Sequence, residues 1–472
     1  MSIRNKLSRR RFLSVTAAAM GGTALAACAP QAAAPAQPAA PAAAGQAAEA
    51  PAAAPAAGDK VGIRIACWGD VTDKQVYDNI VADFMKIEPT IAPVVEQYPG
   101  GHYEKIQANF AANTPADLIY FQGWSWQPFA DKDVLAPLDD LIARDQAQKF
   151  WPDIDNYKNN CQWYGKTYMS VADTGSVIMF YAKELFDAAE VPYPVDGWTY
   201  ADFQNAVEKT SRTEGEVQYY GYAQAGGWNG TYLRSLHWMR MNGALEWDSV
   251  VEPKQVKWLQ DSIIEGLQYT VVDTIAKGYC PSPATISGGG VTVATGRVAM
   301  CMEGPWFLAN MQGGSASREG GVEFDVVEPP VGSTGRDETI AEVHGQVIAK
   351  ASKNPEEAWK LMKYIMEDPG QERIAEGGRM CGTPENIEKF WVPIAQKTYN
   401  FQNGKAFANS MRTGGNPVFA GAGANYDALA GAATPLAVAW DAMLNGTSAR
   451  EALTVAEPLL QKILDDYWAA KS

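Results

Sequence analysis

Residues 61–98 read VGIRIACWGDVTDKQVYDNIVADFMKIEPTIAPVVEQY and alternate the pattern of a strand with that of a helix. Every second residue from Val61 to Cys67 is apolar, which is the period of a β-strand. Apolar residues then recur every four positions from Val76 to Phe84, which is the spacing of one helical face. A second strand is predicted directly after this helix, at 91–98.

The alternation continues with a predicted helix at 103–112 and a predicted strand at 116–121. A β-α-β-α-β order favours a parallel sheet that helices cover on both faces. Open α/β sheets bind ligands at the carboxyl ends of their strands. Trp68 and the loop at 122–126 are therefore the first candidate binding positions.

The chain is too long for one hydrophobic core. It has 472 residues, of which 47% are hydrophobic and 20% charged, and this is the composition of a folded globular protein. Chains beyond about 250–300 residues usually divide into several domains. We therefore expect two lobes or domains.

The charge balance argues against nucleic acid as a partner. The formal net charge is −15, and residues 1–27 contain five basic side chains and no acid, so the remainder carries −20. Polyanions are repelled by such a chain. The fifteen Trp and twenty Tyr residues offer flat apolar faces of the kind that stack on sugar rings.

Residues 1–27 have the pattern of an export signal. Residues 8–13 read SRRRFL and resemble the twin-arginine signal, and the apolar run that follows is too short to span a membrane. The run ends in LAAC at 25–28, which resembles the bacterial lipobox, in which the chain is cut before the cysteine and its thiol is acylated. We expect a mature lipoprotein that begins at Cys28, and the alternative is a plain secretory signal that contains a cysteine by chance.

Residues 29–58 are predicted to form a flexible tether. They contain eighteen Ala and six Pro and no aromatic residue, so they cannot bury a core. Such a segment would separate the folded part of the chain from a membrane.

The remaining cysteines predict neither a zinc site nor a disulfide framework. They lack C-x-x-C spacing, and their odd number leaves at least one thiol unpaired. One or two disulfides remain an alternative, because an exported protein can form them. The five residues are Cys67, Cys161, Cys280, Cys301 and Cys381.

Seven short motifs follow one another along most of the chain. They read PADLI at 115–119, LAPLD at 135–139, GKTY at 165–168, YAKELF at 181–186, WTYADF at 198–203, GRVAM with GPW between 296 and 306, and ASKNPEEAW at 351–359. In this order they resemble the extracellular solute-binding proteins of ABC importers, in the sugar-binding family that includes maltose-binding and glycerol-phosphate-binding proteins. Two positions depart from the family pattern: 171–173 lacks a common proline, and Ala182 replaces a common Asn.

The resemblance implies an α/β fold of the two-lobe periplasmic-binding-protein type (type II-like), with hinge strands and a ligand cleft between the lobes. The motif positions put the crossings between lobes near 172–176, 301–306 and 368–375. Lobe one is then expected at 59–173 and 305–370, and lobe two at 174–304 and 371–472. Residues 1–27 are the leader, and 28–58 are the lipidated cysteine and tether.

Strand ends and motif positions together predict the ligand-binding residues. Aromatic faces would stack on sugar rings, polar side chains would bond hydroxyl groups, and glycines would let a ligand approach the backbone. The candidates are Trp68, Tyr103, Gln122, Trp124, Asp173, Thr174, Trp228, Gly304, Trp306, His344 and Gly345. Trp126 is an alternative to Trp124, and Trp238 is expected to be structural.

The candidate segments also predict the charge of the ligand. They contain Asp70, Asp173 and Glu303 and no basic residue, whereas a phosphate group calls for Arg or Lys. His102, Arg379 and Arg412 are the basic side chains expected near the site, and none of them lies inside these segments. We therefore expect an uncharged sugar, with glycerol phosphate or another polar solute as the alternative.

No catalytic motif supports an enzyme. A glycosidase needs two carboxylates about 5–9 Å apart, which sequence does not exclude, so a carbohydrate-active enzyme remains an alternative. A surface adhesion or scaffold protein, which would bind no small ligand, is a third class. The expected protein is a monomeric, cofactor-free receptor, anchored at the outer face of the cytoplasmic membrane, that delivers sugar to a membrane permease.

Overall fold

The computed structural model describes residues 60–98, 101–224, 228–312, 321–335, 338–414 and 434–471, and for 228–233 and residue 471 the backbone alone. The leader, Cys28 and the tether lie outside the described residues, so their assignments stay predictions.

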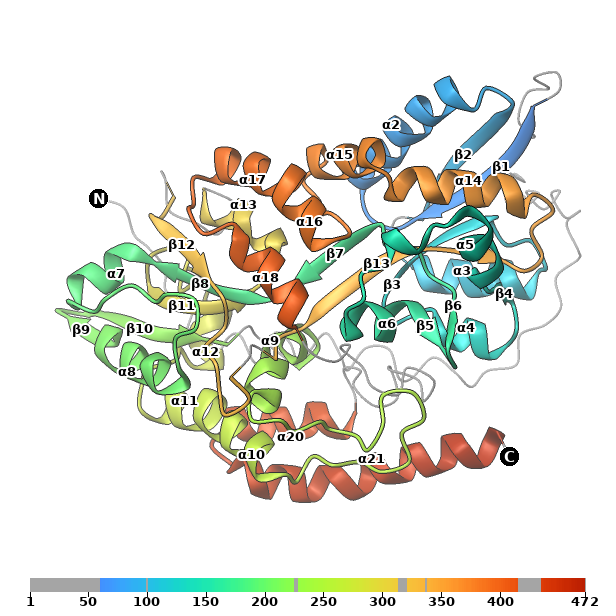
Figure 1. The fold of residues 1–472 in the computed structure, drawn as a ribbon. Helices are drawn as coiled ribbons and strands as arrows, with labels where there is room; N and C mark the ends of the chain where they lie inside the picture. Colours follow the sequence, from blue (N-terminus) through green and yellow to red (C-terminus); the bar gives the residue numbers. More distant parts are fainter. Residues whose placement is uncertain are drawn as a thin grey trace, which may run out of the picture. The chain divides into compact units, whose positions relative to one another are not determined.

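The first sheet has the strand order β2-β1-β3-β13-β4, and β7 pairs with β13 as well (Figure 1). Its strands are β1 (Val61–Cys67), β2 (Ile91–Gln97), β3 (Leu118–Gln122), β4 (Leu135–Ala136), β7 (Asp173–Ser176) and β13 (Ala341–Ala349). β1 runs parallel to β2 and β3, as predicted, but β13 runs antiparallel to β3, β4 and β7. The sheet is mixed because β13 arrives from the second sheet and not through a crossover helix.

Helices predicted from periodicity cover this sheet. α2 (Val71–Ile87) begins with a capping box in which Asp70 accepts hydrogen bonds from the Thr72 and Asp73 amides, and it buries one apolar face. α3 (His102–Ala111) follows β2, and α14 (Pro355–Met366) begins at the proline of the ASKNPEEAW motif. α15 (Asp368–Glu376) packs against α2, as Figure 1 shows.

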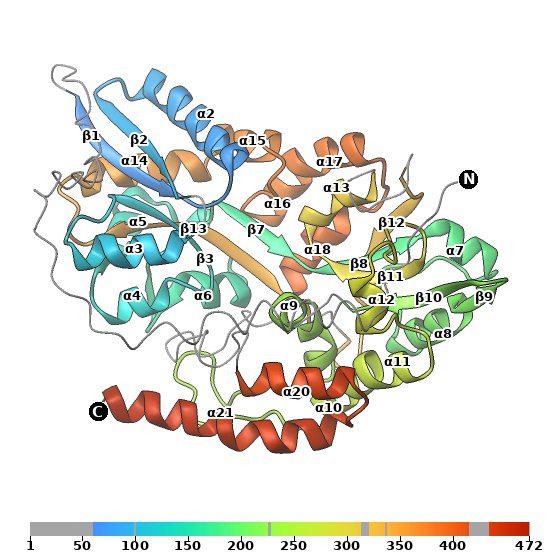
Figure 2. The same cartoon turned by 180° about the vertical axis from the view of Figure 1, so that it is seen from behind.

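The second sheet has the order β12-β8-β11-β10-β9. Its strands are β8 (Ile178–Ala182), β9 (Arg212–Glu214), β10 (Val217–Ala223), β11 (Val298–Glu303) and β12 (Phe324–Val327). α20 (Pro435–Leu444) and α21 (Ala449–Lys471) lie side by side, as Figure 2 shows, and α20 also contacts α9 (Trp228–Arg240). Each sheet and its helices form one lobe.

Trp238 is structural, as predicted. Its ring is fully buried and stacks on Phe203 with the ring centroids 4.5 Å apart. Its indole Nε1 donates a hydrogen bond of 3.0 Å to the Tyr222 hydroxyl. The residue therefore belongs to the core of the second lobe.

The first passage between the sheets lies at Val177, between β7 and β8, close to the predicted 172–176. The second passage differs from the prediction of 301–306, and the boundary at residue 305 is a correction. β12 still pairs with β8, so the chain returns to the first sheet only between Val327 and Ala341. The physical reason is that Gly304-Pro305 ends β11 and starts the 3-10 turn η3 (Pro305–Phe307), which keeps the chain on the second lobe.

The third passage also lies later than the predicted 368–375. Those residues form α15, which packs on α2 of the first lobe. The chain then passes beside β7. There the Thr174 amide donates to the Met380 carbonyl, and the backbones of Asp173 and Cys381 form an isolated antiparallel β-bridge. α17 (Val392–Tyr399) already contacts α13 (Leu308–Met311), which follows η3.

Candidate functional site

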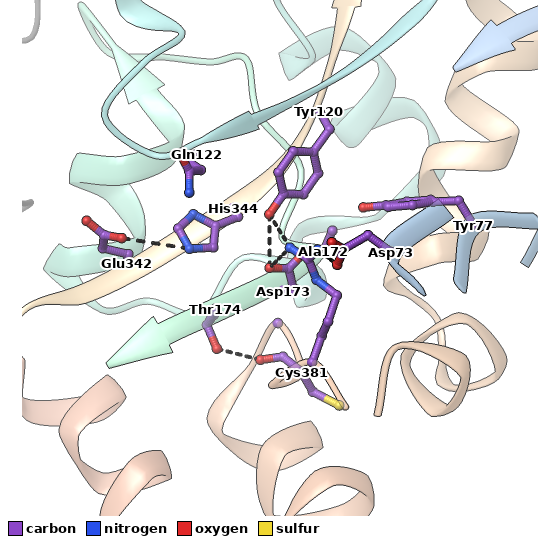
Figure 3. A network of polar contacts seen from close by, with 12 residues as sticks. Asp73, Tyr77, Tyr120, Gln122, Ala172, Asp173, Thr174, Glu342, His344 and Cys381 are labelled. Atoms are coloured by element: carbon purple, nitrogen blue, oxygen red, sulfur yellow. Dashed lines mark hydrogen bonds and ion pairs between the residues drawn. The ribbon is translucent and has the colours of Figure 1, made fainter. Parts of the chain in front are cut away.

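Polar side chains gather where β3, β7 and β13 meet (Figure 3). His344 of β13 pairs across the sheet with Gln122 of β3 on one side and with Asp173 of β7 on the other. Residues two apart on a strand point to the same face, so Glu342 shares the face of His344. Three predicted binding residues thus come together at one end of the first sheet, beside the passage to the second.

Asp173 is held firmly by one carboxylate oxygen and leaves the other free. The residue is 2% exposed, and its Oδ1 accepts hydrogen bonds from the Tyr120 hydroxyl at 3.1 Å and from Arg379 Nη2 at 2.9 Å. Its Oδ2 is buried and has no hydrogen-bond partner among the described residues. A ligand hydroxyl that donates to this oxygen would satisfy it.

Arg379 joins three elements around Asp173, because it contacts Asp73 of α2, Tyr120 of β3 and Asp173 of β7. It forms ion pairs with Asp73 of α2 at 2.6 Å and with Asp173 at 2.9 Å, and its side chain is 15% exposed. Its Nη2 also donates to the Tyr120 hydroxyl at 2.5 Å. Burial acts to lower the pKa of the guanidinium, but Asp173, with Tyr120, Tyr77 and Asp73, raises it well above its usual value. Arg379 is therefore charged, and both of its ion pairs are with these two acids.

Glu342 and His344 form a second, looser pair. His344 Nε2 lies 3.8 Å from Glu342 Oε2, and both side chains are buried. Burial raises the pKa of Glu342 well above its usual range and lowers the pKa of His344 to about 4. The sequence predictions omitted Glu342, although the two-residue period of the strand through His344 could have indicated it.

Tyr103, Gln122 and Trp124 also belong to this cluster. The Tyr103 hydroxyl donates to Gln122 Oε1 at 2.9 Å and accepts from Ser125 Oγ at 3.0 Å. The Trp124 ring meets His344 edge to face with the centroids 5.8 Å apart. Trp126 is instead fully buried and donates to the Asn160 carbonyl at 2.9 Å, so it belongs to the core.

Trp306 presents an exposed aromatic face beside β7. The residue is 49% exposed, and its Nε1 donates to Glu303 Oε2 at 3.0 Å. Its ring lies over Gly304, since a Cβ built there would come within 2.3 Å of the indole. A Cβ on Gly175 would lie 3.5 Å from the same ring and 3.6 Å from His344 Nε2, so the ring reaches the cluster.

Glu303 of β11 forms an ion pair with Arg234 of α9 within the second lobe. Its two carboxylate oxygens accept from Arg234 Nε and Nη2, each at 2.7 Å. Such a bidentate pair fixes the orientation of the carboxylate, which then holds the Trp306 indole. Glu303 therefore serves to position Trp306.

Four predicted binding residues are not shown to take part in the polar cluster. Trp68 is 38% exposed after β1, and no described contact joins it to the cluster. The Thr174 hydroxyl donates to the Cys381 carbonyl at 2.6 Å, and a Cβ on Gly345 would lie 2.0 Å from the Ser170 carbonyl, so both serve packing inside the protein. Trp228 opens α9, but its side chain lies outside the described residues. A ligand role for these four stays a prediction.

A surface pocket of about 580 Å³ lies away from this cluster, between Lys183, Gln312 and Tyr399. The cluster between β3, β7 and β13 combines unsatisfied buried polar atoms with an exposed aromatic face. We therefore place the candidate site at that cluster.

The described residues contain no group of His, Cys, Asp and Glu side chains that could hold a metal ion. All five described cysteines are free and buried. Burial raises the pKa of each thiol, for example that of Cys280 to about 11, which suppresses the reactive thiolate. No helix in the described part of the chain has the length and apolar character to cross a membrane.

Residues 68–372 match the family described as bacterial extracellular solute-binding protein, and the chain belongs to this family. The maltotriose-binding protein of Pyrococcus abyssi is 23% identical over 314 residues, which cover 65% of this chain and 63% of that protein. A binding protein of Brucella abortus is 25% identical over 280 residues, which cover 56% and 61%. The chain thus spans less than two thirds of the length of these relatives.

Solved structures show the same fold over more of the chain. The cyclic alpha-maltosyl-1,6-maltose binding protein of Arthrobacter globiformis has a TM-score of 0.69 at 16% identity and covers 86% of this chain and 100% of its own. The sugar-binding protein MalE of Xanthomonas citri has a TM-score of 0.69 at 19% identity, with 87% and 100% covered. The substrate-binding protein Lmo0181 of Listeria monocytogenes, in complex with cycloalternan, has a TM-score of 0.66 at 20% identity, with 86% and 100% covered. The chain therefore has the two-lobe α/β fold that the sequence predicted, in a family of binding proteins.

Proposed function

We propose that this protein is the substrate-binding lipoprotein of an ABC transporter, which captures an uncharged sugar or oligosaccharide and delivers it to a membrane permease. The observation that carries the proposal is that the exposed Trp306 ring lies beside Gly175 of β7, the strand that also carries Asp173 with its unsatisfied Oδ2, where the chain passes between the two sheets. Sugars have apolar ring faces that stack on indole and hydroxyl groups that donate to carboxylates. The names of the relatives, several of which bind maltose-type oligosaccharides, support the same ligand class.

Capture is proposed to proceed by closure of the lobes. Trp306 follows β11 of the second sheet, whereas Asp173 and His344 lie on strands of the first sheet. A ligand held between them would contact both lobes at once. Closure would exclude water from the site, and each polar contact would then contribute more.

The ion pairs around the site favour an uncharged ligand over a phosphorylated one. Arg379 is bound by two acids, Arg234 is bound by Glu303, and Arg412 lies 2.6 Å from Glu388. His102 is buried and its pKa is lowered by burial, so it stays neutral at physiological pH. A phosphate would have to break one of these pairs and lie beside the Asp173 carboxylate. Glycerol phosphate is therefore the second candidate.

A thermal shift screen tests the proposal. A ligand that binds only the folded state raises its stability by RT ln(1 + [L]/Kd), so neutral oligosaccharides such as maltotriose should raise the melting temperature. Sugar phosphates at equal concentration are the control and should have little effect. Affinity should change little between 50 and 500 mM salt, on the order of twofold or less, because neutral contacts are not screened. Strongly salt-sensitive binding of glycerol phosphate alone would favour the second candidate.

If the protein is a receptor, it must release the sugar chemically unchanged. Prolonged incubation with maltotriose followed by chromatography should return only maltotriose. Shorter products that scale with protein concentration would instead support the carbohydrate-active enzyme.

The anchor at Cys28 is a separate part of the proposal. It rests on the LAAC motif at 25–28 and on the tether that follows it. Cys28→Ser should move the protein from the membrane fraction to the soluble fraction of cells, while Cys67→Ser, a change in the folded region, should leave the fractionation unchanged. Equal membrane association of all three proteins would refute lipid attachment at this cysteine.

A further inference from the structure

Glu342 is a buried acid in the candidate site with an unsatisfied carboxyl group. The residue is 3% exposed, and its Oε1 has no hydrogen-bond partner among the described residues. Its Oε2 lies 3.8 Å from His344 Nε2, which is beyond hydrogen-bond distance. A buried polar atom without a partner costs free energy, so a partner supplied by a ligand would be favourable.

Neither Arg379 nor any cation on the helices packed against β13 forms an ion pair with Glu342 in the described part of the chain. Four of these cations lie 2.9 Å or less from another carboxylate, and the pairs are Arg379 with Asp173, Arg412 of α18 (Lys405–Thr413) with Glu388, Lys158 of α6 (Asp155–Cys161) with Asp153, and Lys363 of α14 with Asp145. Lys360 of α14 lies 3.4 Å from Glu88, and Lys405 of α18 is exposed. The other titratable neighbours, which stay neutral at physiological pH, are His344, Tyr103 and Tyr120. No described cation therefore compensates a charge on Glu342, and burial favours its protonated form.

We propose that Glu342 is a ligand-binding residue that stays uncharged and donates a hydrogen bond from its carboxyl group to a hydroxyl oxygen of the sugar. This inference rests on the proposed function and specifies the chemistry of the same site. The free Asp173 Oδ2 can only accept a hydrogen bond, whereas a protonated Glu342 can donate one. Hydroxyl groups both donate and accept, so a polyol satisfies both residues. An anion would be repelled by Asp173.

The protonation state can be measured without any ligand. An acid that is protonated in the folded state and ionises near pH 4.3 when unfolded costs the fold stability as the pH rises above that value. Glu342→Gln removes this cost, so the melting temperature of the variant minus that of the wild type should increase steadily from pH 4.5 to pH 8. Glu372→Gln, which changes an exposed acid of α15, should show no such trend. A Glu342→Gln difference that is constant over this range would mean that Glu342 is ionised, and would overturn the proposal.

The ligand contact is tested by binding of maltotriose as the probe. Gln keeps a donor and an acceptor, so Glu342→Gln should retain the affinity within about threefold, while Glu342→Leu should weaken it roughly tenfold or more, by loss of the hydrogen bond and the unpaired ligand group. Circular dichroism would confirm that both variants are folded. Wild-type affinity in Glu342→Leu would overturn the contact. A wild-type protein that binds neither maltotriose nor other neutral oligosaccharides would overturn the ligand role together with the proposed function, whereas the pH series would still report the protonation state.

Discussion

Trp306 is an exposed aromatic residue whose ring lies beside Gly175, on the side of that residue where His344 Nε2 also lies. An aromatic contact contributes on the order of 0.5–1.5 kcal/mol beyond its buried area. Trp306→Ala should therefore weaken oligosaccharide binding by about tenfold or more once the lost burial is added, with the melting temperature nearly unchanged because the ring is half exposed. Calorimetric titration measures the affinity, and Trp306→Phe is the control that should keep part of it. Unchanged binding by a folded Trp306→Ala protein would mean that Trp306 serves packing and does not bind the ligand.

Arg379 is the residue on which the orientation of Asp173 depends. Removing its charge would leave Asp73 and Asp173 beside each other without a cation, and breaking a buried ion pair by removing one partner typically costs about 3–5 kcal/mol. We expect Arg379→Met to lose stability of this order in urea unfolding. Arg450→Met, which removes an exposed pair with Asp261, is the matched control and should change little. A similar small effect for both variants would show that the Arg379 network adds no stability.

At the scale of elements, β13 is held against the segment before β7 by a close backbone contact at Gly345. A Cβ there would lie 2.0 Å from the Ser170 carbonyl oxygen, and backbone cannot rotate away as a side chain can. Gly345→Ala should destabilise the protein by about 1–3 kcal/mol, which is the usual cost of overpacking.

Gly62→Ala is the control for this prediction. Gly62 lies in β1, and a Cβ there would meet nothing within 4 Å. Its substitution should be neutral or slightly stabilising, since alanine reduces the freedom of the unfolded chain. Chemical denaturation compares the two variants. If Gly345→Ala were as stable as wild type and yet bound sugar poorly, the glycine would serve the ligand and not the packing.

At the scale of the whole molecule, three passages of the chain connect the two sheets. Short passages can absorb changes in backbone angles while the sheets stay rigid. Saturation with maltotriose should reduce the radius of gyration in solution scattering. Folded Trp306→Ala at the same sugar concentration should show a smaller reduction, because fewer molecules are occupied. An unchanged radius, with binding verified by calorimetry, would indicate rigid lobes.

The sequence by itself determined the local elements and the family. β1, α2, β2, α3 and β3 overlap the five predicted segments in the predicted order, because the burial of one face of a strand or helix is a local pattern. The proline at residue 355 stands at the first position of α14, where its fixed backbone angle suits a helix start. The motifs predicted the family and with it the two-lobe fold.

Only the tertiary structure decided how these elements share the two sheets and which side chains meet. The return to the first sheet after Val327, the place of Glu342 beside His344, and the commitment of Arg379 to two acids all depend on pairing between distant segments. Trp124 and Trp126 are two residues apart, a spacing that would put both side chains on one side of an extended stretch. In the structure Trp124 contacts His344, whereas Trp126 lies in the core. Strand register and burial set these differences, and neither is encoded in the period of a single segment.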